Sequence, residues 1–170
     1  IREVLISKEA IEAKKKELAE RISRDYKGKD LLVVGVLKGS VIFASELIKN
    51  ITIPCEIDFM AVSSYGSSSE TTGVVRILKD LDSEISGKHI LIVEDIVDSG
   101  VTLSYLLNYL KTRNASSVEI ASLLTKPSRR KVDIDCKYVG FETPDEFLVG
   151  YGLDYAEKYR NLPFIGILKR

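Results

Sequence analysis

The sequence predicts an α/β fold in which a mainly parallel β-sheet is flanked by helices. The continuous apolar run 31–37 (LLVVGVL) is too short for a buried helix and is typical of a strand covered on both faces, and 89–94 (HILIVE) repeats this buried-strand pattern. Helical patterns alternate with such strands along the chain, which indicates right-handed βαβ units. Ligands of these sheets bind at the carboxyl ends of the strands, so we expect the functional site there.

The first predicted element is an amphipathic helix that ends near Gly28. Ser7 has a residue type typical of a helix N-cap, and Ile11, Leu18 and Ile22 recur at helical spacing among Lys and Glu residues. The other predicted elements follow in chain order: strand 31–37, helix 40–48, strands 53–62, 74–78 and 89–94, helix 101–111, strand 118–124, and short apolar runs at 138–141, 147–151 and 164–168.

The composition is that of one ordinary soluble domain. The chain has 170 residues, 45% of them hydrophobic, and 25 Lys plus Arg balance 25 Asp plus Glu. A net charge of zero disfavours bulk attraction to nucleic acid, and no apolar run approaches the roughly 20 residues that span a bilayer. Cys55 and Cys136 form no CxxC motif, and the single histidine, His89, excludes the usual zinc ligand sets. We see no signal peptide, and we expect a cytoplasmic protein without nucleic-acid or membrane partners.

Chemistry-bearing residues gather in the segment 90–103 (ILIVEDIVDSGVTL). Its hydrophobic strand leads directly into the adjacent carboxylates of Glu94 and Asp95. Like charges side by side are unfavourable without a ligand or a cation. The acidic pair therefore indicates that a ligand or a cation binds at this strand end.

The loop after the acidic pair has the residue types of an anion site. Gly100 permits close backbone approach, and consecutive N–H groups near Val101 begin a helix whose dipole favours an anion. Ser99 and Thr102 add hydroxyl donors, although either one alone is equally well explained as a helix N-cap. Together with the acidic pair, the loop suits a ligand that carries a phosphate and a vicinal diol.

The segment 93–102 (VEDIVDSGVT) resembles the phosphoribosyl pyrophosphate motif of the phosphoribosyltransferases, most closely that of their hypoxanthine-guanine branch. The similarity extends from about residue 4 to the end of the chain. It includes further local patterns at 37–39 (LKG), Ser64-Tyr65, Lys126 and 147–160. The order of these patterns argues against a chance match.

The resemblance implies a type I phosphoribosyltransferase fold, in which a single domain, residues 1–170, carries a small hood built from the N-terminal segment and about 134–170. It implies a purine-salvage enzyme that transfers the 5-phosphoribosyl group from phosphoribosyl diphosphate to N9 of hypoxanthine or guanine and releases pyrophosphate. It also implies Mg²⁺ as cofactor and a homodimer or homotetramer.

Two alternatives stay open at this point. The first is an RNA-binding regulator on the same fold that senses nucleotides, which predicts a broad basic face and is disfavoured by the zero net charge. The second is a phosphoribosyltransferase for another base. Lys126 and Phe147 argue for a 6-oxopurine instead.

In the resembled family, the loop after the acidic pair holds the 5′-phosphate of the sugar. The residues that this implies here are Asp98, Ser99, Gly100, Val101 and Thr102. Glu94 and Asp95 would lie against the ribose 2′ and 3′ hydroxyls, directly or through magnesium-bound water. Asp98 would also face N7 of the purine as the catalytic general base, whereas by itself it reads as a capping aspartate.

The resemblance assigns pyrophosphate binding to the turn that contains Lys38 and Gly39. By spacing alone this is an ordinary Gly-bearing turn with a solvated lysine. In the family its Leu37–Lys38 peptide is expected to be cis, a costly form that clusters at ligand sites. Ser40 stands where many relatives carry Gly or Ala.

Two further groups are implied for the pyrophosphate. Ser64 and Tyr65 lie in the hydroxyl-rich segment 63–73, which by composition is a flexible surface loop. We favour its functional interpretation, a lid that closes over the pyrophosphate and excludes water. Arg160 would reach the same leaving group.

The purine site implied by the resemblance begins with Lys126, whose ammonium only donates and would favour a 6-oxo group over the amino group of adenine. Phe147 would stack on the ring, and the Leu148 backbone would hydrogen-bond to its edge. Arg129 and Arg130 lie in the same basic cluster and have no assigned role.

Asp154 also belongs to this side of the site and would anchor a second magnesium ion. The implied metal residues are then Glu94, Asp95 and Asp154. Magnesium prefers one or two carboxylates together with water and phosphate oxygens, which matches so sparse a set.

Overall fold

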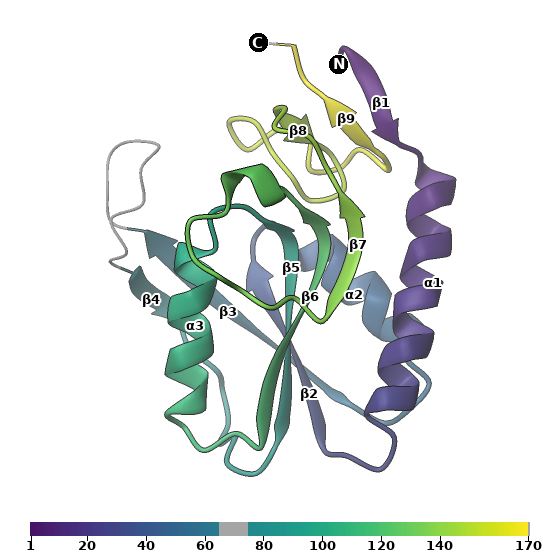
Figure 1. Ribbon diagram of the computed structural model, residues 1–170. Coiled ribbons are helices and arrows are strands. Elements are labelled where there is room, and N and C mark those ends of the chain that lie inside the picture. Colours follow the sequence, from purple (N-terminus) through teal and green to yellow (C-terminus); the bar gives the residue numbers. More distant parts are fainter. Residues whose placement is uncertain (65–74, 170) are drawn as a thin grey trace.

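The computed structural model describes residues 1–64 and 75–169, which form two β-sheets with helices packed against the larger one (Figure 1). The helices are α1 (Lys8–Asp25), α2 (Val41–Asn50), α3 (Val101–Lys111) and the short 3₁₀ helix η1 (Pro127–Arg129). The strands are β1 (Glu3–Ile6), β2 (Leu31–Leu37), β3 (Glu56–Ser64), β4 (Val75–Lys79), β5 (His89–Val97), β6 (Ser117–Thr125), β7 (Tyr138–Glu142), β8 (Leu148–Val149) and β9 (Ile165–Ile167).

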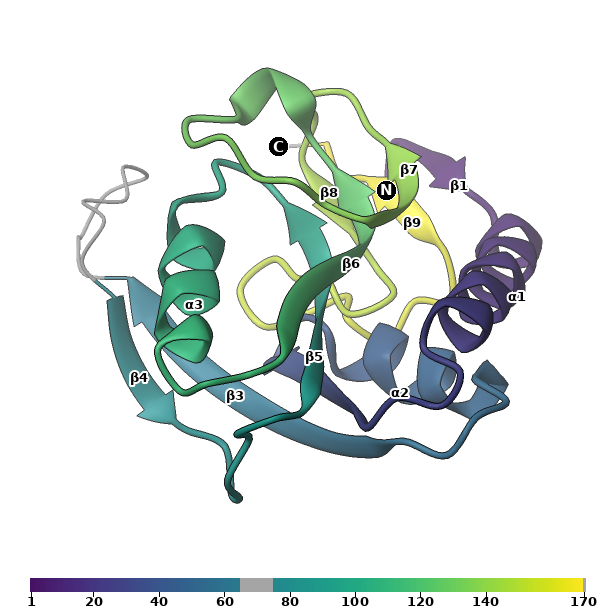
Figure 2. The ribbon, with the colours of Figure 1, turned by 60° about the horizontal axis from the view of Figure 1, so that its bottom comes forward.

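The larger sheet has six strands in the order β4-β3-β2-β5-β6-β7. The five strands β3-β2-β5-β6-β7 run parallel to their neighbours in the sheet, whereas the edge strand β4 is antiparallel to β3. Helix α3 covers one face of this sheet, and α1 and α2 cover the other (Figures 1 and 2). The predicted α/β fold with a mainly parallel, helix-flanked sheet is confirmed.

The central strands are apolar throughout because both of their faces are buried. In β2, Leu31 and Val33 join the hydrophobic cluster that includes α1 and α2, while Leu32 and Val34 join the cluster that includes α3. Successive side chains of a strand point to opposite faces, so one continuous run serves both clusters. This burial fixes β2 and β5 in the middle of the sheet and sets their carboxyl ends side by side.

Helix α1 begins as predicted and ends earlier. The Ser7 hydroxyl accepts the N–H of Ala10 at 3.1 Å, so Ser7 is the N-cap. The helix ends at Asp25, and Tyr26, which is 2% exposed, is its C-cap. Gly28 lies in the turn beyond, with a φ of 77°.

Two strand boundaries also differ from the prediction. β3 begins at Glu56 instead of at residue 53, because Pro54 has no N–H to give to a ladder. β5 continues through Glu94 and Asp95 to Val97, since β6 pairs with it along this whole length. The acidic pair therefore lies inside a strand, which directs its two side chains to opposite faces.

The smaller sheet joins both ends of the chain into a hood. Its strands follow the order β1-β9-β8 and are antiparallel (Figure 1). We expected the hood to begin at about residue 134, but β7 pairs with β6 in the larger sheet. Tyr138 explains this difference, because it is fully buried and its hydroxyl donates to Asp25 Oδ2 at 2.6 Å, which ties β7 to α1.

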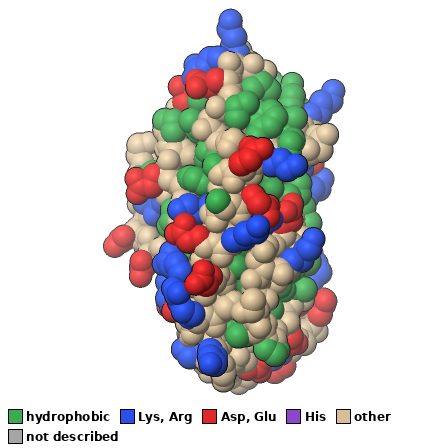
Figure 3. Space-filling model, turned by 90° about the vertical axis from the view of Figure 1, so that its right-hand side faces the viewer, with side chains coloured by type: hydrophobic (Ala, Val, Ile, Leu, Met, Phe, Trp, Pro, Cys, Tyr) green, Lys and Arg blue, Asp and Glu red, His purple; other side chains and the backbone are tan. Residues whose placement is uncertain are grey.

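The face that carries α1 is mixed in charge. Lys and Arg side chains are interspersed with Asp and Glu, and hydrophobic side chains gather toward the end where β1 and β9 lie (Figure 3). Val4 of β1 is 52% exposed. Among the described helices, none combines the length and the apolar character that crossing a membrane requires.

Candidate active site

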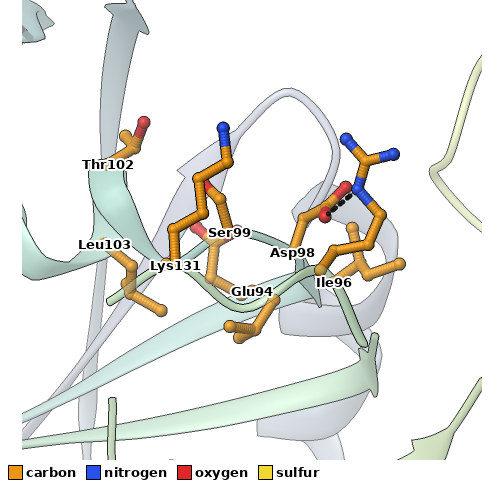
Figure 4. Close-up of a pocket in the computed structure, with 10 residues that line it drawn as sticks. Glu94, Ile96, Asp98, Ser99, Thr102, Leu103 and Lys131 are labelled. Atoms are coloured by element: carbon orange, nitrogen blue, oxygen red, sulfur yellow. Dashed lines mark hydrogen bonds and ion pairs between the residues drawn. The ribbon is translucent and has the colours of Figure 1, made fainter. Parts of the chain in front are cut away.

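A cavity of about 260 Å³ opens at the carboxyl end of β5, where parallel sheets bind their ligands. Asp98 and Ser99 lie on the loop that leaves β5, and Thr102 lies in the first turn of α3 (Figure 4). Lys131 approaches from the segment after η1, and its amino group points to the same side as the Thr102 hydroxyl. The lining residues are Glu94, Ile96, Val97, Asp98, Ser99, Gly100, Thr102, Leu103, Arg129 and Lys131.

The loop at this cavity has the backbone of an anion site. Gly100 takes the N-cap position of α3 with a φ of 85°, a left-handed conformation that favours glycine. Gly100 makes no side-chain cap bond, and the N-terminus of α3, whose dipole favours an anion, opens onto the cavity that Gly100 and Thr102 line. The N-cap alternative holds only in part for Ser99, whose Oγ accepts the Val101 N–H at 3.4 Å.

The segment after η1 fixes the position of this loop. The Ser99 carbonyl accepts the N–H groups of Lys131 at 2.9 Å and of Val132 at 3.2 Å. Arg130 donates to the Asp98 carbonyl at 3.2 Å and to Thr125 Oγ1 at 2.6 Å. Arg130, one of the two arginines without an assigned role, therefore holds the loop against β6.

The acidic pair is divided between two sides of β5. Glu94 lines the cavity, whereas Asp95 contacts the turn that follows β2. Burial, and secondarily the charge of Asp95, raises the pKa of Glu94 well above its ordinary value. Burial also raises the pKa of Asp95 to about 6, a shift that Asp154 adds to and that the Ile96 N–H and Arg160 oppose. Two half-buried carboxyls with raised pKa values are typical of a functional site.

The turn after β2 packs directly against Asp95. Its Leu37–Lys38 peptide is cis, as expected. A Cβ on Gly39 would lie 2.1 Å from Asp95 Oδ2, and a Cβ on Gly152 would lie 2.2 Å from the Gly39 carbonyl oxygen. Both glycines are therefore required by close approach, and the turn is held between β5 and the segment after β8.

Ser40, which departs from the family pattern, does not face the site. Its side chain is fully buried, and its Oγ donates to the Val36 carbonyl at 2.7 Å. The Ser40 hydroxyl therefore adds a bond from the N-cap position of α2 back to β2, and the turn itself is left to Lys38 and Gly39.

A network of charges surrounds this turn. Arg160 donates to the Gly152 carbonyl at 2.6 Å and to Glu157 at 2.8 Å, and it lies 3.5 Å from Asp154 Oδ1. Glu157 also accepts from Lys38 Nζ at 2.6 Å. These contacts bring together Lys38, Arg160 and Asp154, three residues that the sequence analysis assigned to the pyrophosphate and metal side of the site.

Glu157 is a residue that the sequence analysis did not single out. Its two cationic partners, Lys38 first and then Arg160, lower its pKa to about 2. Its backbone is left-handed, with a φ of 68°, which is uncommon for a residue with a side chain. No local motif marks it, because one partner lies 119 positions away in the chain.

A second cavity, of about 740 Å³, adjoins the first and contains three residues assigned to base binding or catalysis: Asp98, Lys126 and Phe147. Lys126 Nζ donates to the Glu146 carbonyl at 2.8 Å. The ring of Phe147 meets that of Tyr155 edge-on, with centroids 5.5 Å apart. The remaining lining residues are Arg2, Arg129, Asp145, Glu146, Leu168 and Lys169.

Leu148 lies beside this cavity within the hood. Its side chain is 6% exposed, and its backbone belongs to β8, opposite Ile167 of β9. Arg129, the other unassigned arginine, lines both cavities and donates from Nε to Asp98 Oδ1 at 3.0 Å. Its separation of 31 positions from Asp98 explains why no sequence pattern indicates the pair.

The three carboxyls assigned to metal binding do not form one cluster. Within residues 1–64 and 75–169, no three His, Cys, Asp or Glu side chains are grouped as a metal site. Asp154 is close enough to Asp95 for its charge to raise the pKa of Asp95, while Glu94 faces the first cavity. Such a set fits Mg²⁺, which binds through one or two carboxylates together with substrate phosphates and water.

The predicted lid lies almost wholly outside the described residues. Tyr65 and the segment 65–74 are not described, and Ser64 is described only as the last residue of β3. The lid interpretation therefore stays a prediction.

The fold and the loop after β5 agree with a comparison of the chain with known families. The family described as "Phosphoribosyl transferase domain" matches residues 4–156, and the chain belongs to this family. Within it, the chain is 55% identical to the hypoxanthine-guanine phosphoribosyltransferase of Bacillus subtilis (strain 168), over 99% of the chain and 94% of that relative.

Solved structures of the same branch have the same fold. A hypoxanthine phosphoribosyltransferase from Staphylococcus aureus is 54% identical with a TM-score of 0.97, over 99% of this chain and 92% of that one. A hypoxanthine-guanine phosphoribosyltransferase from Bacillus anthracis is 51% identical with a TM-score of 0.96, over 99% of each chain. The chain is therefore similar to this branch in sequence and in structure over nearly its whole length.

Proposed function

We propose that the chain is a purine-salvage enzyme that transfers 5-phosphoribosyl from phosphoribosyl diphosphate to N9 of hypoxanthine or guanine. The products are IMP or GMP and pyrophosphate. Relatives with this name, 54–55% identical over 99% of the chain, support the proposal. The observation that carries it is the position of Asp98. This residue lines both the first cavity, at loop 98–102, and the second cavity, which contains Lys126 and Phe147.

Asp98 is the proposed general base. As N9 of the purine forms its bond to the anomeric carbon, the bond from that carbon to the pyrophosphate oxygen breaks, and the proton on N7 passes to Asp98. A general base contributes about 10² to 10⁴ in rate, so we expect Asp98→Asn to lose turnover on this scale. The variant should keep the wild-type urea unfolding midpoint, because the Asp98 side chain is 45% exposed. Near wild-type turnover would leave Asp98 only a structural role.

The ribose, its 5′-phosphate and its pyrophosphate group are assigned to the two sides of β5. Backbone amides of the loop 98–102 bind the 5′-phosphate, and Glu94 and Asp95 bind the ribose hydroxyls. Lys38, Gly39 and Arg160 bind the pyrophosphate, with Ser64 and Tyr65 closing over it. The short distances from Lys38 and Arg160 to the Glu157 carboxylate support this, because they show two cations that already hold one anionic group.

The base is held in the second cavity. Lys126 donates to the 6-oxo group, Phe147 stacks on the ring, and the Leu148 backbone binds its edge. Asp154, which is assigned to the same region, lies 3.5 Å from Arg160 of the pyrophosphate side. An ammonium has no acceptor, so adenine, which presents an amino group at position 6, is disfavoured.

Mg²⁺ is the proposed cofactor, with Glu94, Asp95 and Asp154 as its candidate carboxylates. When bound, it offsets the charge of the departing pyrophosphate. The raised pKa values of Glu94 and Asp95 support this assignment, because a nearby cation would favour their charged forms.

We further propose that the chain works as one domain in a homodimer or homotetramer in the cytoplasm, without nucleic-acid or membrane partners. The free thiols of Cys55 and Cys136 support a reducing compartment. The comparisons lend no support to the RNA-binding regulator that the sequence left open.

The decisive experiment is an assay of phosphoribosyl diphosphate with hypoxanthine, guanine, xanthine, adenine and uracil, with and without Mg²⁺. We expect turnover with hypoxanthine and guanine that depends on Mg²⁺, and none with adenine or uracil. Turnover with adenine or uracil alone would indicate a different base specificity. Tight, salt-sensitive RNA binding on filters without any turnover would indicate the regulator.

A further inference from the structure

Two consecutive arginines donate hydrogen bonds to Asp98. Arg130 donates from Nε to the backbone carbonyl of Asp98 at 3.2 Å, and Arg129 donates from Nε to its side-chain Oδ1 at 3.0 Å. Arg129 Nη1 also lies 3.7 Å from Asp145 Oδ1. The backbone and the carboxylate of the proposed base are therefore each fixed by a separate guanidinium.

We propose that Arg129 is a positioning residue, which orients the Asp98 carboxylate so that it accepts the N7 proton of the purine. The proposal rests on the proposed function of Asp98. It assigns a role in the reaction to one of the two arginines that no motif explained.

Stability does not account for this ion pair. The side chains of Arg129 and Asp98 are 44% and 45% exposed, and exposed ion pairs contribute little to folding. The loop itself is already held by Arg130 and by the bonds to the Ser99 carbonyl. What Arg129 adds is a fixed direction for a carboxylate that would otherwise rotate on an exposed loop.

The geometry of the contact fits such a role. The Arg129 N–H donates to the Lys126 carbonyl at 3.0 Å, which ties the arginine to the proposed purine-binding lysine. Its Nε donates to one oxygen of Asp98, and the second oxygen of the carboxylate is left to accept the N7 proton of the purine. A guanidinium is planar and rigid, whereas a lysine ammonium is a flexible point charge that fixes no plane.

The test measures purine kinetics for Arg129→Met and Arg129→Lys. We expect Arg129→Met to lower kcat/KM for hypoxanthine by about 10- to 100-fold, the cost of a misplaced catalytic group. The KM for phosphoribosyl diphosphate should change less than about twofold, because Arg129 acts through the carboxylate that meets the purine and not through the groups that bind the sugar. Arg129→Lys should recover only part of the loss. The matched control is Arg24→Met in α1, an exposed arginine paired with Glu20, which should keep wild-type kinetics.

A double-mutant cycle separates this proposal from the proposed function. In an Asp98→Asn background, Arg129→Met should have almost no further effect on turnover, since both changes act through one carboxylate. Wild-type kinetics in Arg129→Met, or a full additional loss in the Asp98→Asn background, would overturn the positioning role alone. Near wild-type turnover in Asp98→Asn would overturn both this role and the base assignment. Absence of turnover in the wild-type protein would overturn the function itself.

Discussion

The electrostatics of Asp95 and Glu157 depend on contacts with residues that are distant in the chain. Asp95 is half-buried beside Gly39 and interacts with Asp154 and Arg160. Glu157 bridges Lys38 and Arg160. One carboxyl has a raised pKa and the other a lowered one, although both lie near the same turn. The difference follows from burial in the first case and from two cations in the second.

The raised pKa of Asp95 predicts a pH-dependent cost to stability. The folded value of about 6 exceeds the ordinary value of 3.8, so the folded state binds a proton more tightly than the unfolded state. Asp95 therefore lowers the free energy of unfolding as pH rises from about 4 through 6. We expect Asp95→Asn to gain stability over the wild type across this window in urea unfolding. If the free energies of unfolding of the variant and the wild type differ by a constant amount from pH 4 to 8, the raised pKa is contradicted. Asp133→Asn, at an exposed position, is the control.

Glu157→Gln tests the charge network around the turn. If Lys38 and Arg160 bind pyrophosphate, the Glu157 carboxylate competes for both, and its removal should strengthen inhibition by pyrophosphate. We expect an inhibition constant up to about fivefold lower, a modest effect because these pairs are exposed. Glu20→Gln in α1 is the matched control. Weaker inhibition by pyrophosphate would show instead that Glu157 orients the two cations.

Residues that belong to one continuous segment could be predicted from the sequence, and residues that act through distant partners could not. Loop 98–102 follows a recognisable strand, and its amides depend only on local backbone conformation. Glu157 and Arg129 gain their roles from contacts across 119 and 31 positions. A single sequence carries no information about such pairs until the fold brings them together.

Among the elements, the buried strands could be predicted because burial on both faces leaves an uninterrupted apolar run. The ends of elements depend on partners instead. The sequence pattern of β5 stops at the acidic pair, but β6 continues to pair with it as far as Val97. Two strands of the hood, 148–149 and 165–167, have only two and three residues. Their apolar runs are too short to be distinguished as strand or helix from the sequence.

The contact between the turn after β2 and the segment after β8 predicts the effect of Gly152→Ala. Gly152 has a φ of 101°, and its added Cβ would lie 2.2 Å from the Gly39 carbonyl oxygen. Gly28 is a matched control, with a φ of 77° and no atom within 4 Å of an added Cβ. We expect Gly28→Ala to cost about 1–2 kcal/mol from the left-handed backbone, and Gly152→Ala to cost more.

Urea unfolding measures both costs, and the KM for phosphoribosyl diphosphate measures displacement of the turn. Gly152→Ala should raise this KM, while Gly28→Ala should leave it unchanged. Equal losses of stability in the two variants would show that the turn moves freely away from the new methyl group.

For the whole molecule, the proposed site predicts that its ligand and metal stabilise the fold together. Ligand at 100 times its dissociation constant adds about 2.7 kcal/mol to the free energy of unfolding. We expect phosphoribosyl diphosphate to raise the melting temperature more with Mg²⁺ than without it, because the carboxyls of the protein form no three-residue metal cluster among the described residues. Ribose 5-phosphate, which lacks the pyrophosphate, is the control. An equal rise of the melting temperature with and without Mg²⁺ would contradict the proposal that the metal binds together with the substrate.

The meeting of both chain ends in the hood has a consequence for biosynthesis. Arg2 lines the second cavity and donates its N–H to the Ile167 carbonyl at 2.7 Å, while Leu168 and Lys169 line the same cavity. A nascent polypeptide on the ribosome can assemble the larger sheet once β7 has emerged from the exit tunnel. It cannot complete the wall around the second cavity until residues 165–169 have followed, so this cavity forms later than the larger sheet.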